Sequence, residues 1–519
     1  MATAPSYRAA RARPIPAVLV AVVLILGAWP LLISVPAPLQ DWPNHLARVH
    51  IIDTLLRGDA EWAPFYRLNF ALVPNVALDV GVLAGIRAGL SDAAAGQAFL
   101  LLTYAVFVGG FCALARRFGP LGLARVAAGV ALFYTPPLFW GLVNYVFALG
   151  VGMGLLAAWL GAGARSRFAV AALGTALLFF CHLIAAGAFV ITIGCCELAE
   201  LHRDGRAWRS RWSSILALAT LMTLFAAAPA DPLHEIAWNG TASLWAFVRW
   251  KIIIFLQNGI NGATWPVRYV TWFGALIALI AAVVARPRPR VALGVLAGAM
   301  VVALLAIAAP QRIGSGSLLD DRLALVPILL LAATVRPGFR NPRLGRIAGG
   351  VLIATAVARI VALMLVWRGP AAEFRDYDAA IGRLPRGTML VMARGRPIDA
   401  VTWPLFWANP YTSIEAQGVA HGAFVPMIFA NIAQQPLVLD SRYEGIKQPL
   451  DLSDPLLQAQ SLDRVRAMCA GNPVAVPGVA ITVLYSPPGR RFTDAAGRSV
   501  ELYRGRRVVV LDGCAMAAR

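Results

Sequence analysis

Long apolar runs recur along most of the chain, and they constrain its fold more than any other feature of the sequence. A helix needs about 20 mainly apolar residues to cross about 30 Å of hydrocarbon. Runs that reach or approach this length occur at 15–35, 94–114, 120–137, 142–161, 168–181, 183–199, 213–230, 269–285, 291–309, 322–335 and 347–367. With 59% hydrophobic and 14% charged residues, the composition excludes a soluble domain of this size. We therefore expect an α-helical polytopic membrane protein with about eleven transmembrane helices, in which 168–181 and 183–199 form either two short helices or one long one.

The basic residues predict how these helices are oriented. The net charge is +20, but the arginines form short clusters between apolar runs and not the continuous basic stripe that nucleic-acid binding requires. The clusters are Arg116–Arg117, Arg165–Arg167, Arg203–Arg211, Arg286–Arg290 and Arg336–Arg346. With eleven spans, all of them fall on the side of the N-terminus, where the run from residue 15 is interpreted as an uncleaved first span. Positive loops stay inside, so this side is predicted to be cytoplasmic.

The C-terminal part of the chain has a different character. After residue 368 the apolar runs shorten to strand length, as at 388–392, 480–485 and 507–511, and helix-like pieces lie at 374–384 and 461–468. We expect a membrane domain over residues 1–368, whose first outer loop is 36–93, and a small extracytoplasmic α/β domain over 369–519. A disulfide between Cys469 and Cys514 is a hypothesis that this placement permits. The other cysteines, Cys112, Cys181, Cys195 and Cys196, fall inside apolar spans.

Ionisable residues gather in the first outer loop, directly after the first span. The segment Pro38-Leu39-Gln40-Asp41-Trp42-Pro43-Asn44-His45-Leu46-Ala47-Arg48 brings an acid, a histidine and an arginine to the edge of the membrane domain. Such groups are expensive near hydrocarbon, so the cluster is a functional-site hypothesis. In the same loop, 43–56 and 77–90 have helical apolar spacing but are too short or too polar to cross, and we interpret them as interfacial helices.

The order of several short motifs resembles a known family. The motifs are Asp41 through His45-Leu46-Ala47-Arg48, then Ala113-Leu114-Ala115-Arg116-Arg117-Phe118-Gly119, Tyr134-Thr135-Pro136-Pro137, Cys181-His182-Leu183, and Asp321-Arg322-Leu323-Ala324-Leu325-Val326-Pro327. In order and topology, over about residues 15–367, they resemble the GT-C superfamily of polytopic, lipid-sugar-dependent glycosyltransferases, which includes protein mannosyltransferases and the aminoarabinose transferases of lipid A. The family's acidic pair is often Asp-Glu, whereas here Trp42 follows Asp41.

The resemblance implies a hexosyl- or pentosyltransferase of the bacterial cytoplasmic membrane. It would move a sugar from a polyprenyl-phosphate donor to the hydroxyl of a glycan, lipid or protein acceptor at the outer face, with inversion. Such a transfer needs a base for the acceptor proton and an electropositive group for the departing phosphate, on opposite faces of the sugar. Asp41 is the candidate base, with a pKa that burial would raise. Its alternative role is an N-cap, because Asp followed by Pro43 fits a helix start.

Further residues are candidates for substrate contacts. His45 lies one helical turn after Asp41 and is a candidate catalytic residue. The alternative is an interfacial histidine with no functional role. Arg322 is the candidate for the lipid phosphate, with a membrane-anchoring pair to Asp321 as its alternative. The remaining candidates are Asn44, Arg48 (alternatively snorkelling to lipid headgroups), Arg312 as a reserve for Arg322, His182 (alternatively a structural, hydrogen-bonded histidine), and Asn144 and Tyr145 as pocket lining.

The sequence contains fewer features that bear on cofactors and on competing functions. His234 and Glu235 are candidates to complete a divalent metal site with Asp41, although no ligand spacing supports one. The sequence has no phosphate-binding Gly-rich loop and no dinucleotide fingerprint, which favours a lipid-linked donor. A transporter of envelope polysaccharide or lipid ranks second, because no internal repeat occurs and the charges gather at one rim. A non-catalytic envelope assembly protein is the third alternative.

Overall fold

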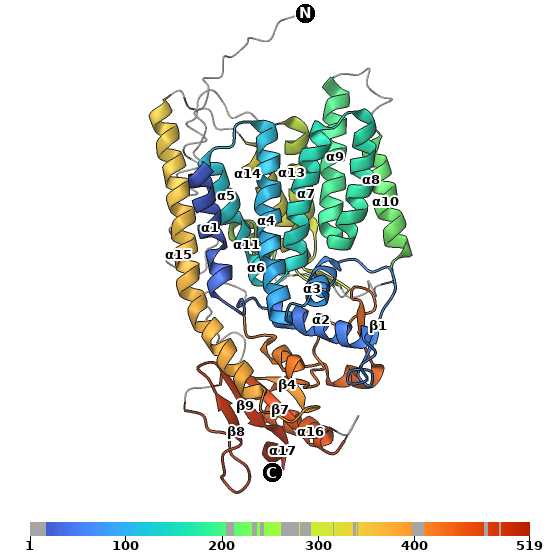
Figure 1. Cartoon of the computed structure of the whole chain (residues 1–519), viewed down its shortest axis with the longest axis vertical. Coiled ribbons are helices and arrows are strands. Elements are labelled where there is room, and N and C mark those ends of the chain that lie inside the picture. Colours follow the sequence, from blue (N-terminus) through green and yellow to red (C-terminus); the bar gives the residue numbers. More distant parts are fainter. Residues whose placement is uncertain are drawn as a thin grey trace, which may run out of the picture.

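The computed structural model describes residues 17–203, 212–230, 236–238, 243–260, 280, 292–314, 316–335, 339, 341–396, 409–471, 476–486 and 489–518. In Figure 1 a bundle of long helices forms one end of the molecule and a small domain with a β-sheet forms the other. This arrangement confirms the predicted fold class, a helical membrane domain with a small C-terminal α/β domain.

The bundle helices match the apolar runs. They are α1 (Ala17–Ile33), α4 (Asp92–Phe118), α5 (Leu123–Phe133), α7 (Val143–Gly161), α8 (Ala164–Cys181), α9 (Leu183–Arg203), α10 (Ser213–Ala227), α13 (Leu293–Ala308), α14 (Leu319–Thr334) and α15 (Pro342–Ile381). Five of the described helices, α4, α7, α8, α9 and α15, are long and apolar enough to cross a membrane, and α1, α5, α10 and α13 are shorter apolar helices. The predicted span 269–285 lies almost entirely outside the described residues.

The runs 168–181 and 183–199 form two antiparallel helices. The chain breaks at His182, whose backbone is extended at φ −170° and ψ 122°. Arg167, near the start of α8, makes an ion pair of 2.8 Å with Glu200, near the end of α9, so the two helices fold back on each other. His182 therefore lies at the tip of a helical hairpin.

The arginines of the predicted clusters that the structure describes lie at one end of the bundle. Arg116 and Arg117 close α4, Arg167 opens α8, Arg203 ends α9 and Arg343 opens α15. These helix ends are at the top of Figure 1, opposite the C-terminal domain. The predicted separation of the arginine clusters from the first outer loop is therefore present in the fold.

Short helices lie at the end of the bundle that faces the C-terminal domain. α2 (Trp42–Leu56) and α3 (Ala77–Arg87) are the two interfacial helices expected in the first loop, and α2 runs across the bundle axis in Figure 1. The four-residue α6 (Pro136–Phe139) connects α5 to α7. A further helix, α11 (Leu244–Ile260), packs against α14 and was not predicted from the sequence.

The C-terminal domain is built on a five-stranded sheet in the order β6-β4-β7-β9-β8. Its strands are β4 (Met389–Arg394), β6 (Leu450–Asp451), β7 (Val479–Leu484), β8 (Glu501–Arg504) and β9 (Val508–Asp512), and β4 is parallel to β6 and β7 while β9 is antiparallel to β7 and β8. The predicted helical piece at 374–384 is the end of α15, which continues from the bundle through Pro370 without a break. The second predicted piece lies in α16 (Pro455–Cys469).

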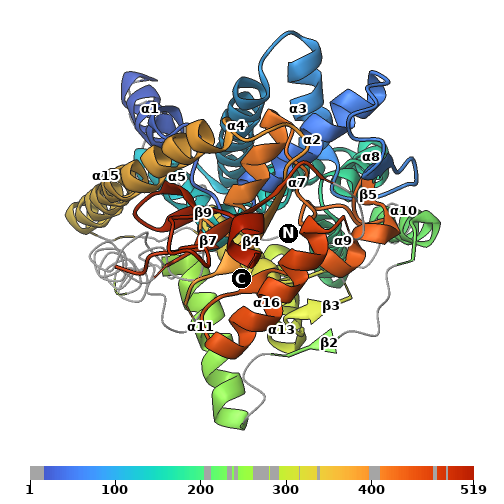
Figure 2. The ribbon, with the colours of Figure 1, turned by 90° about the horizontal axis from the view of Figure 1, so that it is seen from below.

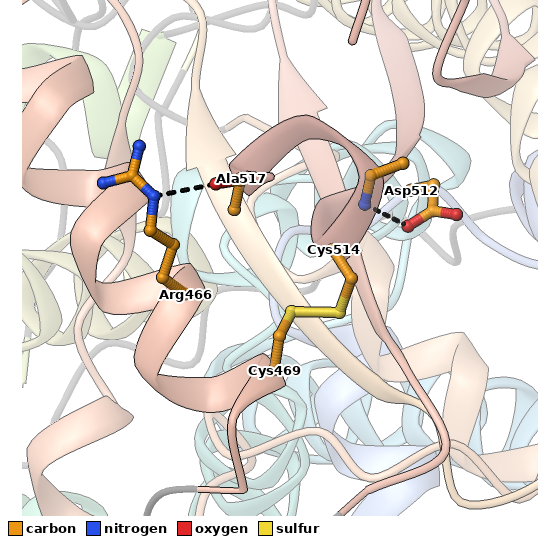
Figure 3. Close-up of a disulfide and its surroundings, with 6 residues drawn as sticks. Arg466, Cys469, Asp512, Cys514 and Ala517 are labelled. Atoms are coloured by element: carbon orange, nitrogen blue, oxygen red, sulfur yellow. Dashed lines mark hydrogen bonds between the residues drawn. A yellow bond between two sulfur atoms is a disulfide. The ribbon is translucent and has the colours of Figure 1, made fainter. Parts of the chain in front are cut away.

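The disulfide hypothesis is confirmed. Cys469, the last residue of α16, is bonded to Cys514 of the terminal helix α17 (Gly513–Ala517) (Figure 3). Arg466 donates to the carbonyl of Ala517 at 2.7 Å, and Asp512 caps α17 by accepting from the Ala515 amide at 3.0 Å. The bond therefore reinforces contacts that already hold the end of the chain against the sheet.

The C-terminal domain is also bound to the segment between α1 and α4. Strand β1 (Tyr66–Leu68) pairs antiparallel with β5 (Leu437–Leu439), and the hydroxyl of Tyr66 donates to the carbonyl of Val425 at 2.6 Å. Figure 2, from below, shows β5 of this domain over the bundle beside α8. One continuous apolar core joins Ala47, Ile51 and Trp62 of this segment to strands β4, β7 and β9. The domain is thus packed against the loop that carries Asp41.

Candidate functional site

The C-terminal domain and the bundle enclose a cavity of about 530 Å³. Its wall on the bundle side comes from the start of α2, Asn75, the beginning of α7, the tip of the α8–α9 hairpin, and residues 316–318 with the first turn of α14. The C-terminal domain contributes a segment around residues 427–435 and Lys447. Its lining includes Asp41, His45, Asn144, Tyr145, His182 and Arg322, so six of the ten predicted site residues meet there. Among the described lining residues, Asp41 is the only carboxylate, and Arg322 and Lys447 are the cations.

Asp41 stands at the N-cap position of α2, but its side chain makes no capping hydrogen bond. Its backbone is held instead, because its amide donates to the carbonyl of Trp140 at 3.1 Å. Burial raises the pKa of this carboxyl to about 7, although the positive charge of Arg322 and a hydrogen bond with Gln40 act in the opposite direction. The carboxylate of Asp41 therefore lines the cavity, and it binds a proton more strongly than an ordinary aspartate does.

Gly141 allows this close approach of the α6–α7 connection to Asp41. Its φ of +82° lies in the region that favours glycine. A Cβ at this position would lie 2.7 Å from the amide nitrogen of Asp41 and 3.0 Å from its Cα. Any larger residue would have to move the backbone that places the carboxylate.

His45 lies one turn from Asp41 and faces the same cavity. Its Nε2 lies 3.1 Å from the carbonyl oxygen of Gly141, so Nε2 carries the proton and donates it to that oxygen. The ring nitrogen Nδ1 is buried without a hydrogen-bond partner. Burial, assisted by the charge of Arg48, holds the pKa of His45 well below its usual range. This histidine is therefore neutral and fastens α2 to Gly141.

Two donors meet at the opposite wall. The amide of Ile184 donates to Nδ1 of His182 at 3.2 Å, which assigns the proton of the neutral ring to Nε2. That Nε2 lies 3.4 Å from Nη1 of Arg322. A guanidinium can only donate, so the two N–H groups cannot satisfy each other. Nε of Arg322 is also buried without a partner. This wall presents donors that lack an acceptor.

Tyr145 and Asn144, at the start of α7, fix the surroundings of these donors. The hydroxyl of Tyr145 donates to the backbone carbonyl of Arg322, and its ring packs edge-on to His182 with centroids 4.9 Å apart. Asn144 accepts from the Leu78 amide at 2.7 Å and donates to the Asn75 carbonyl at 2.5 Å. Both residues line the cavity, and their polar groups are engaged with the protein.

Two residues of the predicted cluster do not line the cavity. Asn44 donates to the carbonyl of Met427 at 3.1 Å and accepts from the amide of Phe429 at 2.6 Å, so it clamps the C-terminal segment over α2. Arg48 is fully buried and makes two hydrogen bonds with Asp79 of α3, at 2.7 and 2.9 Å. The structure therefore does not place Arg48 among lipid headgroups.

Asp321 and Arg312 also lie elsewhere. Asp321 accepts from the Gln257 side chain, and its backbone carbonyl accepts from Asn258 at 3.1 Å. No described ion pair joins Asp321 to Arg322, which was the alternative interpretation of Arg322. Arg312 lies in strand β3 (Arg312–Ile313), which pairs with β2 (Ile236–Ala237) away from the cavity lining.

The wall that the C-terminal domain contributes has no local signal in the sequence. Lys447 donates to the Ala430 carbonyl and to Glu444, each at 3.2 Å, and lines the cavity together with Asn431 and Gln435. Oε1 of Gln435 is buried without a partner. These residues lie far from Asp41 in the sequence, and only the fold brings them together.

The metal hypothesis joins Asp41 to two residues that the structure does not describe. His234 and Glu235 lie outside the described ranges. Within those ranges, no group of three or more His, Cys, Asp or Glu side chains is placed to hold a metal ion.

The fold of the chain is similar to that of a solved structure. No protein-family model matches the chain, and no curated protein matches it. The chain is similar to a solved structure described as the crystal structure of ArnT from Cupriavidus metallidurans bound to undecaprenyl phosphate, at 12% identity and a TM-score of 0.47. The similarity covers 97% of this chain and 98% of the other.

Proposed function

We propose that this chain is a membrane glycosyltransferase that moves a sugar from a polyprenyl-phosphate donor to an acceptor hydroxyl. The observation that carries the proposal is a cavity with a carboxylate on one wall and unsatisfied N–H donors on the other. In the proposed reaction the acceptor oxygen forms a bond to the anomeric carbon while the bond from that carbon to the phosphate oxygen breaks. The acceptor proton passes to Asp41, and the polyprenyl phosphate leaves with the bonding electrons.

Asp41 suits the role of base because of its surroundings. A carboxyl with a pKa near 7 is half ionised at neutral pH and accepts a proton more strongly than an ordinary aspartate. The charge of Arg322 reaches it, yet no contact ion pair between the two is present among the described residues. The carboxylate is therefore neither capping a helix nor neutralised by a direct partner.

The opposite wall suits a phosphate. Nε2–H of His182 and the guanidinium of Arg322 are fixed side by side and lack an acceptor, which a phosphate oxygen would supply. The same donors would stabilise the charge that develops as the polyprenyl phosphate departs. Tyr145 contributes by holding both groups, and Asn144 by fixing the loop at Asn75.

We further propose that this cavity opens on the extracytoplasmic side of a bacterial cytoplasmic membrane. The disulfide Cys469–Cys514 supports this side, because such bonds persist in oxidising compartments. The described arginines at the far ends of α4, α8, α9 and α15 support it as well, because positively charged ends remain in the cytoplasm.

A transporter fits these observations less well. Secondary transporters bind their substrates near the bilayer midplane, between repeats and at broken helices. Here the cavity lies at one end of the bundle, between α2, the α8–α9 tip and the C-terminal domain. That position suits a reaction between a membrane-embedded donor and an acceptor outside the bilayer.

Binding of undecaprenyl phosphate to the purified full-length protein tests the phosphate wall. Because charge-assisted hydrogen bonds contribute about 1.5–3 kcal/mol each, Arg322→Gln should weaken binding about tenfold or more, and His182→Phe should weaken it less. Arg312→Gln is the matched control, since this arginine lies in the neighbouring strand and not in the cavity lining. Equal affinity of the wild type and Arg322→Gln would contradict the proposed phosphate site.

A further inference from the structure

A second cavity, of about 220 Å³, lies behind the helix that carries Asp41. Helical spacing gives α2 two faces. Asp41 and His45 face the candidate active site, whereas Trp42, Leu46 and His50 line the second cavity. The rest of its wall comes from the α1–α2 connection, the first turns of α4, α15 and the 3₁₀ helix η3 (Ile414–His421) of the C-terminal domain. Nothing in the proposed reaction uses this space.

Charges of both signs surround the second cavity. Asp92, at the start of α4, is hydrogen-bonded to Nδ1 of His50 at 2.6 Å, and Asp378 of α15 to Nε2 of His421 at 3.0 Å. Arg375, one turn before Asp378, is exposed and donates to the carbonyl of Val35 at 3.2 Å. A carboxylate and a guanidinium one turn apart suit a ligand that carries separated negative and positive groups.

The cavity also has an acceptor without a donor and a mostly apolar wall. Oε1 of Gln417 is buried with no hydrogen-bond partner. Among the side chains that line the same cavity, Trp42, Pro43, Leu46 and Ala416 are apolar, and of these four only the indole of Trp42 carries an N–H group. A ligand with N–H groups would satisfy Gln417, whereas one without them would not.

The second cavity adjoins the end of the apolar helix α1. Its wall includes Val35 and Pro36, which follow this helix after Ser34. Near that end of α1, Trp29 and Leu32 are 42% and 45% exposed, and Val35 is 38% exposed. In a chain that spans the bilayer, such side chains face acyl chains, so a lipid lying along α1 would bring its headgroup to the cavity.

We propose that the second cavity binds the headgroup of a phosphoethanolamine phospholipid. Arg375 binds the phosphate, and the ammonium group donates to Asp378 and Gln417, while the acyl chains lie along α1. The apolar wall accommodates the ethanolamine carbons. Because α2 separates this cavity from the candidate active site, the lipid would support the helix whose other face presents Asp41 and His45.

Binding of defined lipids to the purified full-length protein tests this site. Native mass spectrometry would compare phosphatidylethanolamine, phosphatidylcholine and phosphatidylglycerol with identical acyl chains. We expect one ethanolamine lipid to bind at least about tenfold more tightly than either of the others, because choline has no N–H donor and glycerol no positive charge. Equal binding of the choline lipid, or tighter binding of the glycerol lipid, would overturn the proposal.

Variants locate the site. Arg375→Gln should weaken binding of all three lipids, because they share the phosphate that this guanidinium binds, whereas Asp378→Asn should remove the preference for ethanolamine. Ala420→Trp should weaken binding of all three lipids by filling the cavity without removing a charge. Arg383→Gln is the control, because this arginine lies exposed just beyond the end of α15 and outside the cavity wall. A preference that survives Asp378→Asn, unchanged binding in Arg375→Gln and Ala420→Trp, or an equal loss in Arg383→Gln would contradict the assignment. Undecaprenyl phosphate binding in the same variants separates this site from the phosphate wall, which they leave intact.

Discussion

At the scale of single residues, Asp41 has an unusual combination of position and freedom. It occupies the N-cap of α2, where an aspartate normally bonds to the helix amides, but its side chain makes no such bond. Its backbone amide is hydrogen-bonded to Trp140, and its backbone packs closely against Gly141. The residue is therefore held in place by its main chain, and its carboxylate is not used for capping. The two interpretations of this residue, cap and base, are thus distinguished by where the side chain points.

The raised pKa of Asp41 predicts a pH dependence. A base must be deprotonated, so the transfer rate should rise about tenfold per pH unit below a pKa of about 7 and level off above it. Arg322 lowers this pKa through its charge, so Arg322→Gln should move the midpoint to higher pH. Initial rates across pH 5 to about 9 would measure both, and a rate that falls as pH rises through 7 would contradict the role of base.

The same shift has a consequence for stability. The folded pKa is above the ordinary value of 3.8, so protonated Asp41 favours folding fully below pH 3.8, and this contribution is lost as pH rises through about 7. Replacement by Asn removes that dependence. Asp41→Asn should therefore not be less stable than the wild type at pH 8, which separates loss of chemistry from loss of folding.

Gly141 gives a second prediction at this scale. Gly141→Ala should lower the transfer rate because its Cβ would displace Asp41. Gly58→Ala is a matched control: its φ is +80°, but nothing lies within 4 Å of the added Cβ. Both variants should lose about 1 kcal/mol or more of stability through backbone strain, measured by thermal unfolding. Only Gly141→Ala should lose activity beyond that, and equal activity in the two variants would argue against the positioning role of Gly141.

At the scale of elements, α11 fixes the first turn of α14. Lys251 of α11 makes a buried ion pair of 2.9 Å with Asp320 and donates to the carbonyls of Ala306 and Ala309. Gln257, on the same helix, holds Asp321. These contacts place Arg322, the next residue, at the cavity.

Removal of one partner of this pair should be costly. Lys251→Met leaves Asp320 buried without its cation and should lower stability by about 3–5 kcal/mol, whereas the double variant Lys251→Met/Asp320→Leu should recover most of it. Thermal unfolding of the two variants in the same detergent is the measurement. If the double variant is as unstable as the single one, the pair is not what couples α11 to α14.

The elements that were predictable from sequence are those with a local pattern. Apolar runs gave the bundle helices, and Asp41 with Pro43 gave the start of α2. The contact of Asn44 with Met427 joins residues 383 positions apart, and the pairing of β1 with β5 joins segments that are almost as far apart in the sequence. Such contacts leave no periodic trace, so the cavity wall around Lys447 and the clamping role of Asn44 could not be inferred. The ion pair between Arg48 and Asp79 was missed for the same reason.

At the scale of the whole molecule, the C-terminal domain forms part of the site. The core that it shares with Ala47, Ile51 and Trp62, and the ion pair of Arg386 with Glu61, fix it over the cavity. The sequence indicated two domains, and the structure shows that α15 passes from one to the other without interruption. Lys447 and Gln435 of the C-terminal domain thus line the same cavity as Asp41.

The disulfide gives a prediction at this scale. Replacement of both Cys469 and Cys514 by Ala should destabilise the C-terminal domain by about 2–4 kcal/mol, because the bond closes a long loop in the unfolded chain. Thermal unfolding would measure this loss, and thiol labelling of denatured wild-type protein without reductant would test the bond. Free thiols at both positions in protein prepared from cells would contradict the proposed extracytoplasmic location.

Asp41 is proposed to act as the base of a sugar transfer to a molecule of the cell surface. Mass spectrometry of surface glycolipids and polysaccharides tests this role in cells with the wild-type protein, with Asp41→Asn and without the gene. We expect a sugar-sized mass to disappear in both the deletion and the variant, because loss of a general base lowers the rate about 10²–10⁴-fold. An unchanged glycan profile in cells that insert Asp41→Asn at wild-type levels would contradict it.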